Sequence, residues 1–193
     1  IYVDESILPI IEDEQAVFET QYNAKLQLVP KSENEVLNAM FNDTAAIAVL
    51  TRNLTKEELA AFKAKKINPK ITRFATDAVA LIRSKTSKDT LVALQDVVDF
   101  INGKTISSIK GLVFDNANSS TVRYFSDLVG IPVNNQKNVF SLKTNQEVIK
   151  YVAEHNGMIG VVGINWIFQP PLDLQESVDK VNVLGVKDTN AAT

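Results

Sequence analysis

The sequence predicts an α/β fold of two lobes, with mixed, mostly parallel sheets and flanking helices. Short apolar runs typical of strands alternate along the chain with segments whose apolar residues have helical spacing. The alternation changes once, where two strand-like runs, residues 71–75 and 78–83, follow each other with no helix between them. We interpret this pair as a crossover between lobes. Lobe 1 then comprises residues 1–75 and 180–193, and lobe 2 comprises residues 76–179.

The first part of the chain is expected to contain three helices and three strands. Apolar residues with helical spacing over residues 7–18, with Pro9 suited to a first turn, predict the first helix. Capping boxes that begin at Ser32 and Thr55 predict the next two, because each pairs a hydroxyl residue with a glutamate three positions later. The expected strands are residues 1–3, 25–29 and 45–50, the last a continuous apolar run as in a buried parallel strand.

The second part is expected to contain three more helices. Residues 91–102 form a helical pattern that Gly103 ends, since glycine favours the left-handed geometry of a helix terminus. Ser119 caps a helix that ends at Gly130, and Thr144 opens a third capping box. The expected strands after the crossover are residues 112–114, 158–162 and 180–186.

Composition excludes several classes of protein. The chain has 193 residues, a net charge of −3 and no long basic run, which disfavours nucleic-acid binding. It has no cysteine, which excludes disulfides and thiolate chemistry, and a single histidine, His155, which disfavours His-dependent catalysis. No P-loop, dinucleotide-binding glycine pattern or His-based zinc motif occurs. We therefore expect no enzyme activity, no catalytic residue, no cofactor and no metal site.

Small hydroxyl and amide side chains follow several expected strands, at the points where helices begin. Such strand-to-helix turns meet at one edge of a parallel sheet, and the N–H groups of helix starts carry partial positive charge. This edge suits an oxyanion, with hydroxyls and one arginine as further donors. A lone cap is usually structural, but the four polar residues at 118–121 exceed what one cap needs. The candidate ligand contacts are Ser6, Ser32, Thr51, Arg52, Asn118, Ser119, Ser120 and Thr121.

Five segments, in this order, resemble a known family. Residues 3–10 are similar to its first ligand loop, 46–58 to its apolar strand with a Ser-Arg pair and Thr-x-x-Glu, and 74–82 to its crossover strand with an aspartate. Residues 118–125 resemble its Ser-Gly-Thr helix start, and 152–163 its late apolar strand. The family is the phosphate-binding proteins of ABC transporters, which have the type II periplasmic-binding fold. The chain most resembles the shorter, lipoprotein-like members of Bacteroidetes-type bacteria.

The resemblance implies a protein that captures inorganic phosphate or a similar oxyanion in a cleft between its lobes and passes it to an ABC transporter permease. It also implies a place in the periplasm or cell envelope, as a lipoprotein where a lipid anchor precedes residue 1, and no other membrane contact. Arg52 would contact the anion or brace its loop. The residues that would contact the anion are Ser6, Ser32, Thr51, Ser119, Ser120 and Thr121.

The chain departs from the family's pattern at three points. Asp115 stands where the family often has an arginine, four residues before the Ser-Gly-Thr helix start, so the site would lose a cation. Ser120 stands where the family has the glycine. Asp115 and Asp77 are candidate acceptors for the proton of hydrogen phosphate. The chain also ends soon after one returning strand, so we expect lobe 1 to be incomplete and the chain to lack a C-terminal segment.

Three other functions remain open from the sequence. The first is binding of another oxyanion or a small acid on the same fold. The second is a partner-binding or signalling module whose cleft has lost its ligand. An enzyme acting on a phosphorylated substrate ranks last, because acid and base candidates are absent.

Overall fold

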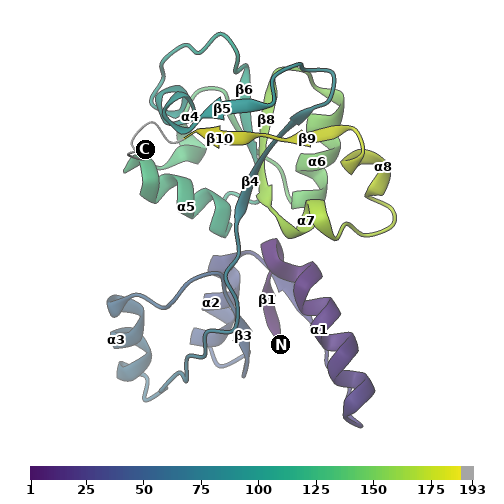
Figure 1. Ribbon diagram of the computed structural model, residues 1–193. Helices are drawn as coiled ribbons and strands as arrows, with labels where there is room; N and C mark the ends of the chain where they lie inside the picture. The colour runs from purple at the N-terminus through teal and green to yellow at the C-terminus, as the bar shows by residue number, and fades with distance from the viewer. Residues whose placement is uncertain (188–193) are drawn as a thin grey trace. The chain divides into compact units, whose positions relative to one another are not determined.

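The structure is a computed structural model that describes residues 1–187 (Figure 1). Contacts divide the chain into unit 1, Ile1–Asp77, and unit 2, Ala78–Thr193. The division falls inside the crossover expected from the sequence. Within residues 1–187 no helix is both long enough and apolar enough to cross a bilayer.

Unit 1 contains a three-stranded parallel sheet in the order β2-β1-β3. Because the strands are parallel, the residues that follow each of them meet at one edge of the sheet. The core consists of Val3, Ile7 and Ile11, with Leu8, Leu28 and Val49 packed against it. The elements are β1 (Tyr2–Asp4), η1 (Glu5–Ile7), α1 (Leu8–Gln21), β2 (Val29–Lys31), α2 (Glu33–Phe41), β3 (Ala48–Val49) and α3 (Lys56–Ala64).

Two of the three strands of unit 1 are shorter than their apolar patterns predict. The run at 25–29 pairs only from Val29 onward, and the run at 45–50 is reduced to Ala48–Val49. Residues 71–75 form no strand, and Ile71 and Phe74 are exposed. An apolar run becomes a strand only where a neighbouring strand and a buried face are available, and tertiary context decides both.

Unit 2 contains a five-stranded mixed sheet in the order β7-β6-β8-β4-β9. β7, β6 and β8 are parallel, whereas β4 is antiparallel to both β8 and β9. The expected α/β class is therefore confirmed. The strands of this sheet are β4 (Val79–Ser84), β6 (Gly111–Phe114), β7 (Val139–Ser141), β8 (Met158–Gly163) and β9 (Val181–Val183).

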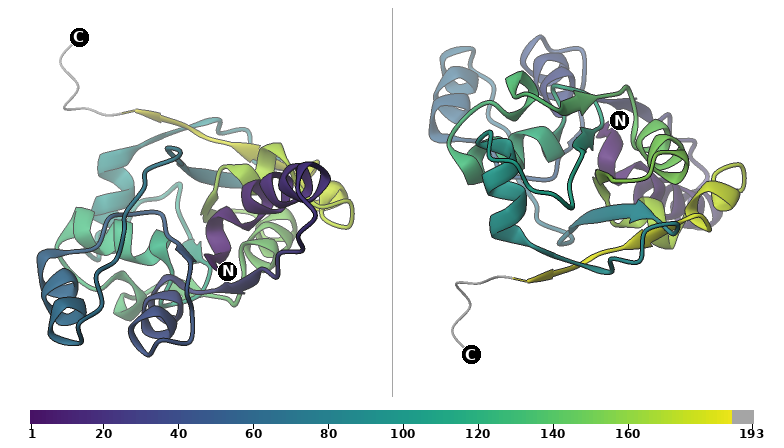
Figure 2. Two further views of the ribbon diagram at one scale, coloured as in Figure 1. Left: turned by 90° about the horizontal axis from the view of Figure 1, so that it is seen from below. Right: turned by 90° about the horizontal axis from the view of Figure 1, so that it is seen from above.

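Helices cover both faces of this sheet (Figures 1 and 2). On one face, Val97 of α4 and Val122 of α5 share a core cluster with Leu112 and Phe114 of β6. On the other face, α6 packs against β8 and β4. The helices of unit 2 are α4 (Leu94–Ile101), α5 (Ser120–Val129), η2 (Val133–Asn135), α6 (Asn145–Glu154), α7 (Asn165–Phe168) and α8 (Gln175–Val178).

The C-terminal residues differ from expectation. We predicted that 180–193 return to lobe 1, but β9 pairs with β4, and β10 (Gly185–Lys187) pairs with β5 (Leu91–Ala93), all within unit 2. Burial explains this, because Val181 and Leu184 are buried and Leu184 joins the unit 2 core. The single strand expected at 180–186 is thus two, and the helix expected from residue 91 begins at Leu94. Residues 188–193 lie outside the described part of the chain.

Candidate functional site

In unit 1, a carboxylate holds the polar residues that follow β1 and β3. Asp4, the last residue of β1, is 1% exposed and accepts hydrogen bonds through Oδ1 from Ser6 N (3.1 Å) and Ser6 Oγ (3.0 Å). Thr51, two residues after β3, donates from Oγ1 to Asp4 Oδ2 at 3.3 Å. Two of the predicted contacts, Ser6 and Thr51, are therefore brought together, with Asp4 between them.

Ser32 begins α2 with the capping box that the sequence predicts. Its Oγ donates to Glu35 Oε2 at 2.7 Å, and its backbone N–H donates to the same oxygen at 3.1 Å. These two hydrogen bonds, the hydroxyl first, lower the pKa of Glu35. The hydroxyl of Ser32 thus donates within its own helix start.

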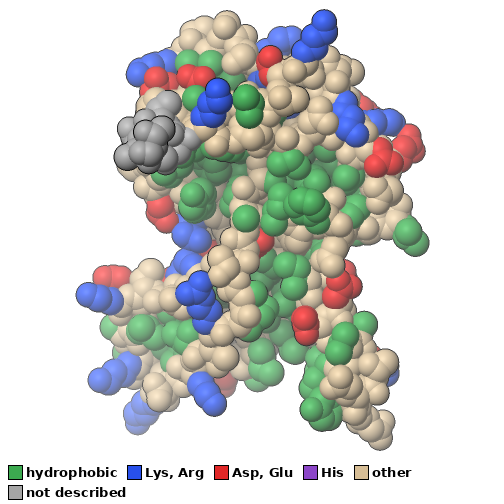
Figure 3. All heavy atoms as spheres, in the orientation of Figure 1, with side chains coloured by type: hydrophobic (Ala, Val, Ile, Leu, Met, Phe, Trp, Pro, Cys, Tyr) green, Lys and Arg blue, Asp and Glu red, His purple; other side chains and the backbone are tan. Residues whose placement is uncertain are grey.

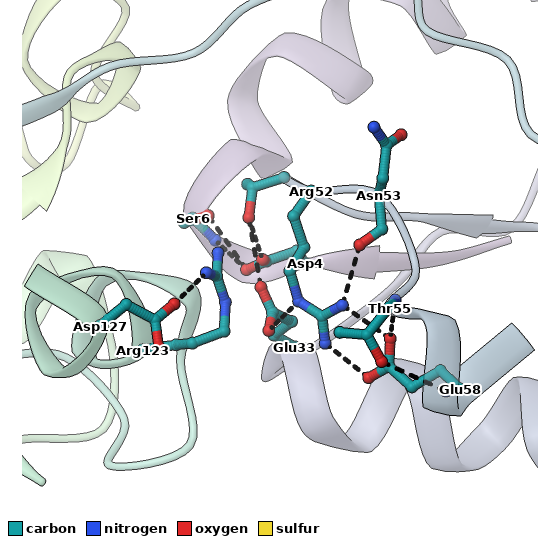
Figure 4. Close-up of polar contacts among 10 residues, drawn as sticks. Asp4, Ser6, Glu33, Arg52, Asn53, Thr55, Glu58, Arg123 and Asp127 are labelled. Carbon is teal, nitrogen blue, oxygen red and sulfur yellow. Dashed lines mark hydrogen bonds and ion pairs between the residues drawn. The ribbon is translucent and has the colours of Figure 1, made fainter. Parts of the chain in front are cut away.

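Arg52 donates to three groups of unit 1 (Figure 4). Nε donates to Glu33 Oε1 at 2.9 Å, and Nη1 and Nη2 donate to the two carboxylate oxygens of Glu58, each at 2.8 Å. Nη1 also donates to Asn53 O at 2.9 Å. The pKa of Arg52 is raised, first by the hydrogen bonds to Glu58, and the same pair lowers the pKa of Glu58. These contacts link α2 to α3, so Arg52 acts as a structural brace between the two helices.

In unit 2, a second carboxylate holds the start of α5. Asp115 directly follows β6 and is 1% exposed. Ser119, the N-cap of α5, donates from Oγ to Asp115 Oδ1 at 2.5 Å, and Thr121 Oγ1 donates to the same oxygen. Ser119 Oγ also accepts the N–H of Val122 at 3.3 Å, so the expected cap is confirmed.

Asn145 joins this network from α6. Its side chain is fully buried, with Nδ2 donating to Asp115 Oδ2 at 3.1 Å and Oδ1 accepting from Gly163 N at 3.0 Å. Asp115 follows β6, Asn145 begins the helix after β7, and Gly163 ends β8. Because these three strands are parallel, one edge of the sheet brings the three residues together.

The remaining predicted residues have different surroundings. Ser120 is buried beside Ser119 and Thr121, whereas Asn118 is exposed in the turn before them, where its N–H donates to Asn116 Oδ1 at 2.9 Å. Of the two candidate proton acceptors, Asp115 lies in the buried network of unit 2. Asp77 is exposed at the end of unit 1.

Sequence reasoning singled out Asp115 but missed the other acidic and amide partners in these two networks. Asp4 carried a signal, because an aspartate two residues before a serine at a strand end is typical of an Asx turn. Glu33 carried none, since a glutamate in a first helical turn is ordinarily explained by the helix dipole. Asn145 and Asn165 both follow strand ends. Asn165 is buried, and no residue among 1–187 hydrogen-bonds its side-chain amide.

Comparisons with known proteins show which family and which solved structures the chain resembles. A family model described as a PBP superfamily domain matches residues 1–192. The structure is similar to a putative phosphate ABC transporter substrate-binding protein with bound phosphate from Clostridium perfringens, with a TM-score of 0.78, 19% identity, and coverage of 96% of this chain and 75% of that one. The comparison with curated proteins found no match.

Other similar structures come from two kinds of protein. An ABC-type phosphate transport receptor from Vibrio cholerae has a TM-score of 0.57 and 15% identity, covering 99% of this chain and 78% of its own. The CcmR regulatory domain of Synechocystis, in complex with 2-PG, has a TM-score of 0.65 and 11% identity, covering 96% of this chain and 79% of its own. At these identities the likeness concerns the fold, and it confirms the fold that the motif order implied.

Proposed function

Because the chain belongs to the PBP superfamily, we propose that it captures phosphate as an extracytoplasmic binding protein of an ABC transporter, without reacting with it. One observation carries the proposal. In each unit, buried or half-buried hydroxyl residues gather where parallel strands end and helices begin. Exposed N–H groups and partial positive charge at such helix starts favour an oxyanion. The similarity to a phosphate-bound relative of the same fold supports this choice of ligand.

In this proposal, unit 2 supplies the start of α5 and unit 1 supplies the residues after β1 and β3. Ser119, Ser120 and Thr121 contact the anion together with the N–H groups of the first turn of α5, a ten-residue helix. Ser6 and Thr51 contact it in unit 1. Arg52 acts as the brace of that loop, since most of its donors serve Glu33 and Glu58. The ABC permease partner and the place in the periplasm or cell envelope are part of the same proposal.

Titration of the purified chain with phosphate tests the proposal. Phosphate at millimolar concentration or below is expected to raise the melting temperature, because a ligand that binds only the folded state stabilises it. Calorimetry should show one bound phosphate for each chain. Thr121→Ala is expected to weaken phosphate binding at least about tenfold, since hydrogen bonds to a charged group contribute about 1.5–3 kcal/mol. Thr105→Ala, which changes an exposed threonine of unit 2, should leave the affinity unchanged. No heat and no thermal shift would overturn the proposal.

A small acid of lower charge is the second candidate ligand on this fold. The observation that favours it is Asp115, a buried carboxylate at the start of α5. A buried negative charge disfavours a multiply charged anion nearby. Stabilisation of the chain by singly charged carboxylic acids, with none by phosphate, would support this candidate over the first.

A further inference from the structure

The surface of α3 and of the segment that follows it is basic, whereas the earlier part of unit 1 is acidic. Residues 56–73 contain six basic and two acidic residues, and residues 1–51 contain two basic and nine acidic residues. All six basic residues are exposed, and Figure 3 shows Lys and Arg side chains gathered over this part of the molecule. We call the set the α3 basic surface: Lys56, Lys63, Lys65, Lys66, Lys70 and Arg73.

Folding places the lysines of α3 on its solvent side. Lys56, Leu59 and Lys63 have the spacing of one helix face, and all three are exposed. After the last turn, the N–H of Lys66 donates to Lys63 O at 2.9 Å, so the chain stays beside the end of the helix. The positive charges on and after α3 therefore lie close together.

Acidic residues do not cancel this charge. Glu58 accepts hydrogen bonds from Arg52 through both carboxylate oxygens, so its charge is compensated inside unit 1. Glu57 is the other acidic residue of the segment. Within residues 1–187, none of the six basic residues forms an ion pair. The α3 basic surface is thus strongly positive in a chain whose net charge is −3.

The stability of α3 explains only part of this charge. Lysines near a helix C-terminus interact favourably with the helix dipole, which accounts for Lys63 and Lys65. Lys65 also donates to Phe41 O at 3.1 Å and lies over the Phe41 ring, 3.8 Å from its centroid. Lys56, in contrast, is the first residue of α3, where a cation opposes the dipole. Lys70 lies beyond the helix, so the dipole does not account for it either.

We propose that the α3 basic surface binds the headgroups of an anionic lipid bilayer. Five of its six residues are lysines, which are compact hydrated charges, whereas arginine is the usual residue for a defined carboxylate or phosphate. Exposed lysines without ion pairs fit a diffuse anionic surface. Leu59, 37% exposed between Lys56 and Lys63, supplies an apolar contact to the headgroup region. The proposal is independent of phosphate capture, and it adds a membrane contact that the family resemblance does not imply.

The acidity of the whole chain makes this contact local. Because the net charge is −3, an anionic bilayer repels the chain in most orientations. Attraction between exposed charges falls off within about 10 Å at 0.1 M salt, so binding requires the α3 basic surface to face the headgroups. Each lysine close to an anionic bilayer should strengthen binding about fivefold.

Co-sedimentation of the whole chain with lipid vesicles in phosphate-free buffer tests the proposal. The wild-type chain is expected to bind vesicles of phosphatidylcholine mixed with phosphatidylglycerol, and not vesicles of phosphatidylcholine alone. Raising the salt from about 0.05 M to about 0.5 M should abolish binding, because salt screens exposed charges. Lys56→Gln/Lys63→Gln/Lys66→Gln should weaken binding at least about tenfold. Lys56→Arg/Lys63→Arg/Lys66→Arg keeps the charge and should bind like the wild type.

A matched variant separates the position of the charge from its amount. Lys88→Gln/Lys137→Gln/Lys150→Gln removes the same charge from three exposed lysines of unit 2. It should leave the vesicle affinity within about twofold of the wild type, since these lysines lie outside the α3 basic surface. All substituted lysines are exposed, so the variants are expected to fold, which circular dichroism verifies.

Two results would overturn the proposal. The first is a wild-type chain that does not bind the anionic vesicles, and the second is an equal loss of binding in the two glutamine variants. Neither result bears on the proposed function, because the phosphate titration is a separate measurement and none of these lysines is a candidate ligand contact.

Discussion

Arg52 donates four of its five N–H groups within unit 1, through three bonds to Glu33 and Glu58 and one to Asn53 O. Glu33 is 1% exposed, so the positive charge of the guanidinium compensates for the lost hydration of a buried carboxylate. The sequence allowed Arg52 two roles, ligand contact or brace. The pattern of donors favours the brace. The stability of the unliganded chain is therefore the measurement that tests the role of Arg52.

Arg52→Ala is expected to destabilise unit 1 in the absence of ligand. Removing one partner of a buried ion pair typically costs about 3–5 kcal/mol, and the partial exposure of Arg52 reduces the expected loss to about 2–3 kcal/mol. Urea unfolding followed by circular dichroism measures it. Arg73→Ala, at an exposed arginine of the same unit, should change stability by less than about 0.5 kcal/mol. Unchanged stability with lost phosphate binding would make Arg52 a ligand contact instead.

The lowered pKa of Glu58 predicts a pH-dependent contribution to stability. The hydrogen bonds from Arg52, its largest cause, favour the ionised form in the folded state. The contribution is present above the unfolded-state pKa of about 4.3 and is lost as the pH falls through the lower folded-state pKa. Glu58→Gln should therefore be less stable than the wild type at neutral pH, and the difference should shrink in acid below about pH 4. A difference in unfolding free energy that stays constant over this range would contradict the assignment.

At the scale of elements, α6 packs closely against the sheet because β8 has a glycine, Gly160, where it faces the helix. A Cβ added at Gly160 would lie 2.9 Å from side-chain atoms of Ile82, Val148 and Val152. Real Cβ contacts are essentially never so short, so a side chain at this position requires Ile82 of β4 or the α6 residues Val148 and Val152 to shift. The same helix begins with Asn145, which means that its distance from the sheet also positions the amide that contacts Asp115.

Gly160→Ala is expected to cost about 1–3 kcal/mol, the usual range for overpacking a core. Urea unfolding measures the loss. Gly160→Ala/Val152→Ala removes one of the three close contacts, so it should cost less than the sum of the two single changes. Additive losses would show that α6 is not held off the sheet by the new methyl group.

At the scale of the whole molecule, the two units have unequal cores. Unit 2 has a large buried cluster drawn from its sheet, α4 and α5. The cluster in unit 1 contains Val3, Ile7 and Ile11. Val17 and Phe18 in the later turns of α1 are exposed, and so is Tyr22 directly after the helix. Figure 3 shows hydrophobic side chains on the surface of α1. Local opening requires less free energy where few apolar contacts are buried.

We therefore expect unit 1 to open before unit 2. In hydrogen–deuterium exchange at neutral pH, the amides of β1 and β2 should exchange faster than those of β4 and β8. Phosphate, on the proposed function, should slow exchange at the start of α5 and after β1. Equal protection of the two sheets would show that the chain unfolds as one cooperative block.

Periodicity and capping chemistry determined much of the fold from the sequence. The capping boxes at Ser32 and Thr55, the N-cap Ser119 and the helix stop at Gly130 appear as expected, because each depends on residues a few positions apart. The buried strands β6 and β8 also agree with their apolar runs. The sequence likewise placed Ser119 to Thr121 at a helix start beside a strand end.

Tertiary structure alone decided which strands pair and which distant residues join each polar network. The apolar residues of 180–186 fit either unit, and only the open edges beside β4 and β5 assigned them to unit 2. Local patterns also identify a hydroxyl without showing its acceptor. Asp115 and Asn145 are 30 residues apart, and the parallel sheet brings them together. The sequence thus determined that polar groups gather at strand ends, whereas contacts between residues distant in the chain decided which strand ends share one hydrogen-bond network, because the parallel sheet brings them to one edge.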